Sequence, residues 1–274
     1  MSERIKLTIE QDIAQVLLDR PEKMNALDGA MFDALIEVGR SLIEQPGLRA
    51  VVMSGAGRAF CAGLDMSRFE SMAETSDRAK APLADQLRLG PRTHGLCNGP
   101  QYAALVWQDI PVPVIAALHG VVFGGGLQIA LGADLRFVAP DTKLSVLEVK
   151  WGLVPYMGGM ERMRHLVRAD LMRDLTFSGR IFSGEEAFSL GLATRVCADP
   201  YQAAMAYAGE LAGRSPDSIR AAKRLLRLAE TADTAALLQA ESDEQIALLG
   251  SANQVEAVRA NHEQRAPEFV MSRH

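Results

Sequence analysis

The feature that most constrains the fold is an apolar run over residues 119–138, interrupted by Gly124, Gly125 and Gly126. A helical pattern begins directly after these glycines. Glycine allows tight backbone geometry with no side chain in the way, and the first amide N–H groups of a helix have no partner inside it. Such a turn can hold an oxyanion. We therefore expect an anion-holding turn where this helix begins.

Composition bounds the class of protein. With 274 residues, 48% of them hydrophobic, the chain can form one large core, or a core with a smaller appendage. A net charge of −5 leaves no basic excess for nucleic acid or anionic lipid, so neither is expected as a partner. The 3 cysteines are far apart and lack zinc-site spacing, which favours a reducing compartment and no metal.

Targeting signals are not evident in this sequence. The first residues are charged, with no apolar signal core, and no later apolar stretch is long enough to span a membrane. We therefore expect no membrane association and a cytoplasmic location.

Strand and helix patterns alternate along the first part of the chain. Residues 7–10 and 13–18 predict a hairpin, and apolar residues at helical spacing predict a helix from Asp28 to Gln45. The apolar run at 50–55 predicts a buried strand, as do residues 113–118 and 135–139. This alternation indicates an α/β fold. Residues 67–100 have little apolar periodicity and predict a long loop with some helix, of the kind that shapes pockets.

The chain from Pro200 onward is predicted to be helical. We divide the whole chain into a core over residues 1–200, which carries the site, and a helical C-terminal region over 201–274. Apolar residues at helical spacing are the candidate buried positions in this region. They are Ala208, Leu211, Ala221, Leu225, Leu226, Leu237, Leu238, Ile246 and Leu249.

A second small-residue turn, Phe60 to Asp65, follows the strand predicted at 50–55. With the glycine triplet and the segments at 20–27, 152–155 and 182–192, it resembles the crotonase (enoyl-CoA hydratase/isomerase) superfamily over nearly the whole chain. The resemblance implies a spiral of repeated ββα units, and a helical C-terminal oligomerisation region that packs in homotrimers or dimers of trimers. It also implies an acyl-CoA thioester substrate. Coenzyme A then enters as part of the substrate, with no permanently bound cofactor.

The same resemblance assigns an oxyanion hole to the backbone amides of Leu64 and Gly125. These groups would hold the thioester oxygen as it becomes an enolate. Backbone donors are fixed by the fold and need no protonation. The alternative is that the two turns only allow a strand and a helix to pack closely.

The acid–base groups depart from the hydratase pattern. Hydratases of this family carry one glutamate just after the glycine triplet and a second further along; the matching residues here are Gln128 and Glu148. A carboxamide can orient water, but it does not accept a proton at neutral pH. Glu148 is therefore the expected general base, with apolar neighbours that would raise its pKa. The alternative is a solvated glutamate paired with Lys150.

Other candidate residues follow from the resemblance. Some isomerases of the family carry an acid where this chain has Tyr156, whose phenol could donate a hydrogen bond or simply fill the pocket. Substrate contacts are expected around Asn25 to Leu27 and Ala62 to Asp65, mostly through the backbone. The candidate substrate-binding residues are Lys23, Ala26, Ala62, Asp65, Arg68 and Tyr156.

Some residues with reactive or charged side chains are interpreted as structural. Cys61 has no histidine in its motif to deprotonate it, so a buried thiol is expected. Asp134 lies at a helix-to-strand junction, where a carboxylate usually accepts from backbone N–H groups. Met157, Met160 and Met163 are expected to line the core from a helix.

The sequence thus favours an acyl-CoA enzyme that stabilises a thioester enolate. With one glutamate retained, it favours double-bond isomerisation or another one-base reaction. Two alternatives stay open. One is hydration, by a water that Gln128 orients or with an acid supplied from residues 67–100, and the other is a catalytically weak acyl-CoA binding protein. A P-loop and a dinucleotide fold are excluded, because the residues after the glycines and the glycine spacing match neither motif.

Overall fold

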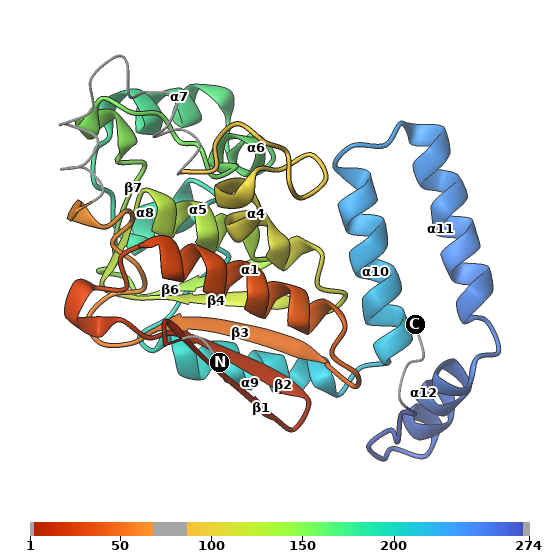
Figure 1. The fold of residues 1–274 in the computed structure, drawn as a ribbon. Helices are drawn as coiled ribbons and strands as arrows, with labels where there is room; N and C mark the ends of the chain where they lie inside the picture. Colours follow the sequence, from red (N-terminus) through yellow and green to blue (C-terminus); the bar gives the residue numbers. More distant parts are fainter. Residues whose placement is uncertain (1–2, 68–86, 271–274) are drawn as a thin grey trace.

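A computed structural model describes residues 3–67 and 87–270 of the chain, and strands and helices alternate along most of it (Figure 1). The strands are β1 (Ile5–Glu10), β2 (Ile13–Leu18), β3 (Ala50–Gly55), β4 (Val114–Leu118), β5 (Val121–Phe123), β6 (Leu135–Val138), β7 (Lys143–Ser145) and β8 (Arg195–Val196). The helices are α1 (Gly29–Ile43), α4 (Gly99–Leu105), α5 (Gly125–Gly132), α6 (Gly159–Met163), α7 (Ala169–Ser178), α8 (Gly184–Ser189), α9 (Pro200–Ala212), α10 (Pro216–Ala229), α11 (Thr234–Leu248) and α12 (Ala252–His262). Short 3-10 turns are η1 (Pro21–Lys23), η3 (Val106–Gln108) and η4 (Glu148–Trp151).

The main sheet is parallel except at its first strand. Among the described residues, six strands pair in the order β1-β2-β3-β4-β6-β8, and β5 pairs with β7 in a separate parallel ladder. The predicted hairpin is confirmed: β1 and β2 are antiparallel, and the turn residues Gln11 and Asp12 have φ of 50° and 62°. Two residues with positive φ twist a hairpin turn to match the twist of its strands.

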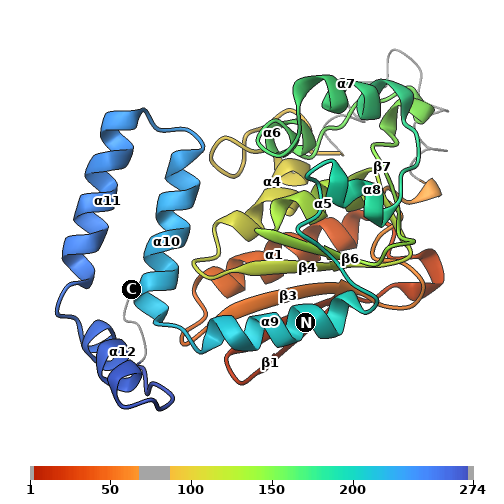
Figure 2. The same ribbon diagram turned by 180° about the vertical axis from the view of Figure 1, so that it is seen from behind.

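Both faces of the sheet are covered, which explains the apolar run in β3. Alternate residues of a strand point to opposite faces. Val51 and Met53 pack in the larger apolar cluster with α1, whereas Ala50 and Val52 pack in a smaller cluster with α9. Figure 2 shows α9 along the face of the sheet opposite α1. The helix predicted from Asp28 is also confirmed, because the Asp28 carboxylate accepts from the Met31 N–H at 2.8 Å and caps α1.

The glycines of α5 allow two close backbone approaches. A Cβ on Gly126 would lie 2.3 Å from the carbonyl oxygen of Cys61, and one on Gly132 would lie 1.9 Å from that of Ala104. The helix therefore packs directly against the turn at 61–65 on one side and against α4 on the other. The predicted start of a helix at the glycine triplet is confirmed, with Gly124 at φ 50° as its N-cap.

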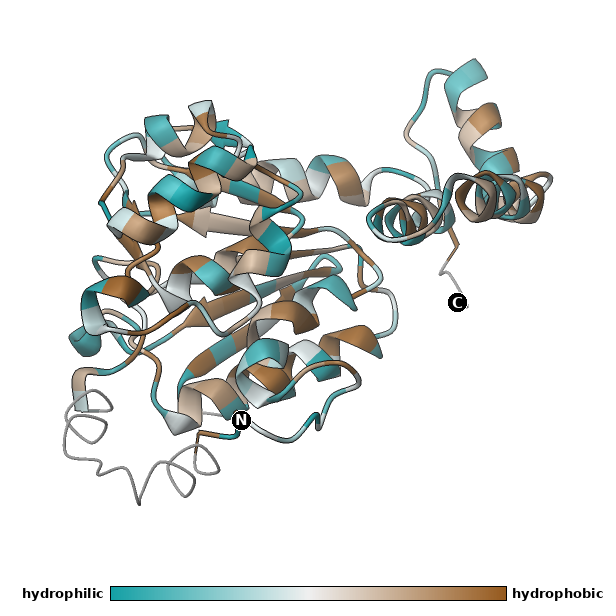
Figure 3. Cartoon of the chain, turned by 90° about the horizontal axis from the view of Figure 1, so that it is seen from above, coloured by the Kyte–Doolittle hydropathy of each residue, from teal (hydrophilic) through white to brown (hydrophobic). Residues whose placement is uncertain are grey.

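The end of the chain is arranged differently. Helices α10, α11 and α12 stand beside the core rather than over the sheet (Figure 1), while α9 packs on the sheet itself. Figure 3 shows hydrophobic residues along the helices that stand apart. Within the described residues, no helix is both long enough and apolar enough to cross a bilayer.

The predicted burial of several C-terminal residues is wrong for the single chain. Ala208 and Ala221 are buried as expected, and Leu211, Leu225 and Leu237 are partly buried. Much of the apolar surface of α10 and α11 does not face the core. The remaining residues that were predicted to be buried are therefore exposed to solvent. These are Leu226 (71% exposed), Leu238 (56%), Ile246 (68%) and Leu249 (62%).

Of the segment predicted as a long loop, residues 68–86 lie outside the described residues. From residue 87 the chain is irregular as far as Asn98, which caps α4 through a hydrogen bond from the Gln101 N–H at 2.9 Å. Some helix is therefore confirmed at the end of this segment.

Candidate active site

Two backbone turns meet at the start of α5. The Leu27 N–H donates to the carbonyl of Gly63 at 2.8 Å, and the Asp65 N–H donates to the carbonyl of Leu27 at 3.1 Å, which fixes the chain on both sides of Leu64. A Cβ on Gly63, at φ 88°, would lie 2.7 Å from the Phe123 carbonyl oxygen and 3.6 Å from the Gly125 nitrogen. The turn that carries Leu64 is thus in direct contact with the turn that carries Gly125.

The amides of Leu64 and Gly125 are available to a ligand. In the part of the chain that the structure describes, neither N–H donates a hydrogen bond to a protein acceptor, whereas their neighbours Gly124 and Asp65 both do. Both residues line a cavity of about 340 Å³ with a mostly apolar wall. Two such N–H groups in residues that line an apolar cavity, one of them at a helix N-terminus, can stabilise a negatively charged oxygen.

Most of the residues predicted to form the site line this same cavity, although they come from four separate segments of the chain. The cavity residues among them are Lys23, Ala26, Ala62, Leu64, Asp65, Gly125, Glu148 and Tyr156. Arg68 lies outside the described residues. Gln128 is 3% exposed and lies behind the wall rather than on it.

The carboxylate of Glu148 has two oxygens in unlike surroundings. One oxygen, Oε1, accepts a hydrogen bond of 2.6 Å from Nε2 of Gln128. The other, Oε2, is buried with no partner among the described residues. Burial raises the pKa of Glu148, against the smaller effect of the hydrogen bonds that it accepts. At 7% exposure, Glu148 is not a solvated residue, and Lys150 lies instead over the ring of Trp151.

Gln128 is held in one orientation by the backbone. Its Oε1 accepts from the N–H of Met157 at 2.9 Å and from the N–H of Gly159 at 3.0 Å. Both lone pairs of that oxygen are therefore used, and the NH₂ group must face Glu148. In this arrangement Gln128 orients the carboxylate of Glu148 and has no acceptor left for a water molecule.

Asn25 and Arg20 hold segments that line the cavity through their hydrogen bonds, and no motif in the sequence gave either side chain a role. The Nδ2 group of Asn25 donates to the carbonyls of Ala56 and Ala59, at 3.0 and 2.8 Å, and so joins two loops. Arg20 donates to the Asp65 carboxylate at 2.5 Å. Partial burial acts to raise the pKa of Asp65, but hydrogen bonds from Ser67 and Arg20 keep it below its ordinary value.

The residues interpreted as structural have structural contacts. Burial raises the pKa of the Cys61 thiol to about 12, and the thiol donates to the Asn25 carbonyl. Asp134 accepts from the Val114 N–H at 2.7 Å. Met163 is buried on α6, but Met157 precedes that helix and lines the cavity.

Aromatic and apolar residues complete the wall of the cavity, and sequence reasoning missed them. Trp151 and Leu153 follow Glu148, while Phe123 precedes the glycine triplet. Their closeness to motif residues in the sequence was the available signal. Which of their side chains face the cavity depends on how the loops fold.

Known proteins resemble the chain over almost its full length. The family model described as Enoyl-CoA hydratase/isomerase matches residues 8–272. The human enoyl-CoA hydratase domain-containing protein 2, mitochondrial, is 32% identical over 268 residues, which cover 95% of this chain and 86% of that protein. The Delta(3,5)-Delta(2,4)-dienoyl-CoA isomerase, mitochondrial, of Rattus norvegicus is 33% identical over 226 residues, covering 81% of this chain and 68% of that protein.

Solved structures agree with the sequence matches. The crystal structure of an enoyl-CoA hydratase from Polaromonas sp. JS666 superposes with a TM-score of 0.84 at 26% identity. The match covers 97% of this chain and 99% of that one. The shared architecture therefore includes the sheet, the two turns and the C-terminal helices.

Proposed function

Because the chain belongs to the enoyl-CoA hydratase/isomerase family, we propose that it moves a double bond within an unsaturated acyl-CoA thioester, with Glu148 as its one base. The observation that carries this proposal is the buried, unpartnered Oε2 of Glu148 in the cavity that Leu64 and Gly125 also line. Relatives named as dienoyl-CoA isomerases support the same class of reaction.

The first step needs stabilisation of negative charge on the thioester oxygen. The N–H groups of Leu64 and Gly125 would both donate to that oxygen as it becomes an enolate. Fixed backbone donors do not have to reorganise during the reaction, and loss of one such donor typically costs about 2.7–4 kcal/mol of transition-state stabilisation. The N-terminus of α5 adds a favourable dipole at the same point.

The second step moves one proton between two carbons. Oε2 of Glu148 removes a proton from the α-carbon, and the electron pair of that C–H bond enters the conjugated enolate. The same O–H group then returns its proton to a carbon at the far end of the conjugated system, and the new double bond forms next to the thioester. No oxidant, reductant or water is consumed, so one carboxylate is sufficient.

The raised pKa of Glu148 suits both halves of this transfer. A carboxylate in an apolar site is a stronger base than one in water, because burial disfavours its charged form. Once protonated, the same group is acidic enough to return the proton at neutral pH.

Hydration is the second candidate, since the Polaromonas neighbour is named an enoyl-CoA hydratase. The contacts of Gln128 leave it no acceptor for the water that hydration needs, because its oxygen accepts two backbone hydrogen bonds, and one N–H of its NH₂ group donates to Glu148. A hydratase would then need a further acid or base to activate water. The third candidate, an acyl-CoA binding protein with little catalysis, would bind thioesters without turnover.

The test is a screen of 2-enoyl, 3-enoyl and dienoyl thioesters in D₂O, with α-proton exchange and product structure as readouts. We expect exchange and a shifted double bond, without added water in the product. Glu148→Gln should lower kcat by about 10²- to 10⁴-fold, the usual contribution of a general base. Glu185→Gln, at an exposed position on α8, should leave kcat unchanged.

Three outcomes contradict the proposal. Full turnover by Glu148→Gln on every thioester that the parent protein accepts would remove Glu148 from the mechanism. A hydroxylated product would favour hydration. Tight thioester binding with neither turnover nor exchange, unchanged in Glu148→Ala, would favour the binding protein.

The expected assembly and location remain proposals. Exposed apolar residues on α10 and α11, including Leu226 and Ile246, support a homotrimer or a dimer of trimers that covers them. The relatives' names place one protein in mitochondria and another in peroxisomes, so the cytoplasmic location is a prediction that fractionation of the source cell would test.

A further inference from the structure

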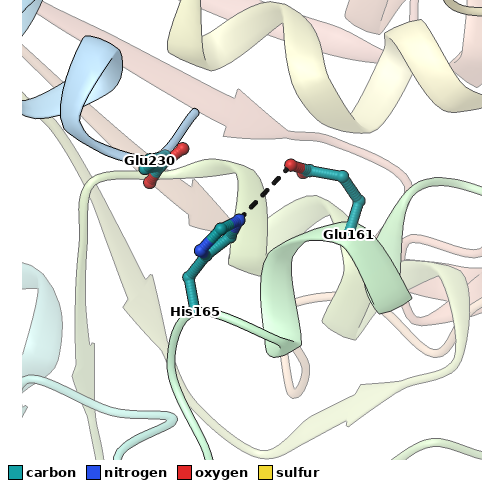
Figure 4. A group of neighbouring side chains, drawn as sticks. All are labelled: Glu161, His165 and Glu230. Carbon is teal, nitrogen blue, oxygen red and sulfur yellow. Dashed lines mark ion pairs between the residues drawn. The ribbon is translucent and has the colours of Figure 1, made fainter. Parts of the chain in front are cut away.

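Three side chains converge between α6 and the end of α10. Donor atoms of Glu161, His165 and Glu230 all lie within 4.8 Å of one another, and Figure 4 shows His165 facing Glu161 with Glu230 beside them. One histidine and two carboxylates are donors that a metal ion can use. Two arginines are already bound there: Arg162 to both oxygens of Glu230, and Arg164 to Nε2 of His165. The cluster is therefore built around ion pairs.

The Arg162–Glu230 pair is the strongest contact of this cluster. Nη1 and Nη2 of Arg162 donate to the two oxygens of Glu230 at 2.6 and 2.7 Å. The side chains are only 11% and 28% exposed. With its amide oxygen turned toward Arg162, Gln108 also accepts from Nε at 2.6 Å. A bidentate salt bridge with little solvent exposure fixes the relative position of its two side chains and also neutralises their charges.

Helix α6 depends on such contacts for its position. It comprises five residues, Gly159–Met163, and one helical turn is unstable in isolation. Its contacts include the buried Gly159 and Met163, Met160 packed against the core, and the Arg162–Glu230 pair. Removal of the pair would therefore leave α6 held by fewer contacts.

The other end of α6 holds the active-site amide. The N–H of Gly159, the first residue of α6, donates to Oε1 of Gln128, and Gln128 in turn donates to Oε1 of Glu148. Gly159 and Gln128 are closely packed, because a Cβ added to Gly159 would lie only 2.7 Å from Cγ of Gln128. A movement of α6 must therefore move Gln128 or break its hydrogen bond.

We propose that Arg162 and Glu230 are a positioning pair for the catalytic carboxylate: they fix α6 against the end of α10, and α6 fixes Gln128 and Glu148. The role of Glu148 as the base rests on the proposed function, but the linkage of contacts does not. The C-terminal helices thereby influence the site without touching it. An assembly that moves α10 would change the rate of proton transfer.

The chain contains a matched control. Arg224 binds both oxygens of Glu244 through Nε and Nη2, at 2.6 and 2.7 Å, which joins α10 to α11 by a pair of hydrogen bonds of similar length and with no contact to α6. Glu230→Gln and Glu244→Gln therefore remove the same charge and the same kind of pair. Only the first change reaches α6.

The kinetic test compares these two variants on the best thioester from the screen. We expect Glu230→Gln to lower kcat about three- to tenfold, within the range of coupling between distant sites, and to leave KM within about twofold. It should also shift the pH at which kcat reaches half its maximum. Glu230→Asp, which keeps the charge, should recover part of the loss. Glu244→Gln should change none of these values.

A second readout does not need turnover. In protein with ¹⁵N-labelled glutamine, the side-chain NH₂ signal of Gln128, assigned by its loss in Gln128→Glu, reports the hydrogen bond to Glu148. We expect this signal to move in Glu230→Gln and to stay in place in Glu244→Gln. An unmoved signal in Glu230→Gln, or equal shifts in both variants, would overturn the proposal. If the parent protein lacks all turnover and the signal still moves in Glu230→Gln, the proposed function is overturned and the positioning pair is not.

Discussion

The α/β core and the C-terminal helices are stabilised by different kinds of contact. The core has two clusters of buried apolar side chains, one on each face of the sheet, and in the described residues neither cluster includes a residue from α10 to α12. Helix α10 instead contacts the core through charged groups, with Lys223 bound to Asp134 at 2.7 Å and Arg227 to Asp109 at 2.5 Å. Helix α11 buries none of its residues.

This difference teaches which part of the molecule is self-sufficient. Burial of apolar area is the main favourable term in folding, and the core provides it within one chain. Exposed ion pairs such as that of Arg227, whose side chain is 53% exposed, contribute about 0–1 kcal/mol each, although the Lys223 side chain is only 11% exposed. The C-terminal helices therefore leave leucines and isoleucines exposed in the single chain, whereas the core buries its apolar clusters within it.

The largest expected effect is a close-packing failure in the core. Gly132→Val would place side-chain atoms against the Ala104 carbonyl, which lies 1.9 Å from the position of a Cβ. We expect a loss of about 3 kcal/mol or more in the free energy of unfolding, measured by urea denaturation, because neither backbone can move easily. Gly209→Ala on α9 is the control, since nothing lies within 4 Å of its Cβ position. It should gain about 0.5–1 kcal/mol, and equal losses in both variants would contradict this account.

A smaller effect concerns the pH dependence of stability at Glu148. Its folded pKa is raised, so the unfolded chain releases the proton more readily than the folded one. The parent protein should therefore lose stability relative to Glu148→Gln as the pH rises from the ordinary glutamate pKa through the raised folded pKa, and the difference should then stay constant. A difference of one between the folded and unfolded pKa values corresponds to about 1.4 kcal/mol, or roughly 2–4 °C in Tm for a chain of this size. Melting curves over pH 4–9 that run parallel for the two proteins would contradict it.

The smallest effect on the fold of the chain is expected in the C-terminal helices. Ile246→Lys and Leu249→Lys change residues that are 68% and 62% exposed, so the free energy of unfolding of the single chain should change by less than about 0.5 kcal/mol. The same changes should reduce the particle mass in light scattering, because a buried lysine would disfavour the interface. An unchanged mass in the double variant would mean that these residues lie outside any interface.

The main elements of the core could be predicted because they depend on local patterns. The helix predicted from Asp28, the hairpin at Gln11 and Asp12, and the helix that starts at the glycine triplet are each confirmed close to the predicted residues. Each rests on hydrogen bonds or backbone angles within a few residues. The exposure of Leu238 and Ile246 could not be predicted, because helical spacing gives the apolar face of a helix and not what lies opposite it.

The candidate site likewise has features that the sequence predicted and features that it did not. The motifs indicated Leu64, Gly125 and Glu148 as members of one site, and all three line one cavity. The orientation of Gln128 and the pair of Arg162 with Glu230 had no sequence signal. They join residues that are 29 to 68 positions apart, so they exist only once the loops have folded.

By itself the sequence determined an α/β chain with two turns whose backbone amides can bind an anion. It also determined that, of the two glutamates of the hydratase pattern, Glu148 is present and the other is Gln128. These features could be determined because glycine conformations and side-chain chemistry are local properties. Only the tertiary structure decided what that glutamine does. The N–H groups of Met157 and of Gly159, the first residue of α6, occupy its oxygen and turn its NH₂ group to Glu148. One oxygen of that carboxylate is left buried without a partner among the described residues. The physical reason is that a carboxamide's role depends on which neighbours donate to it, and the folded chain supplies those neighbours.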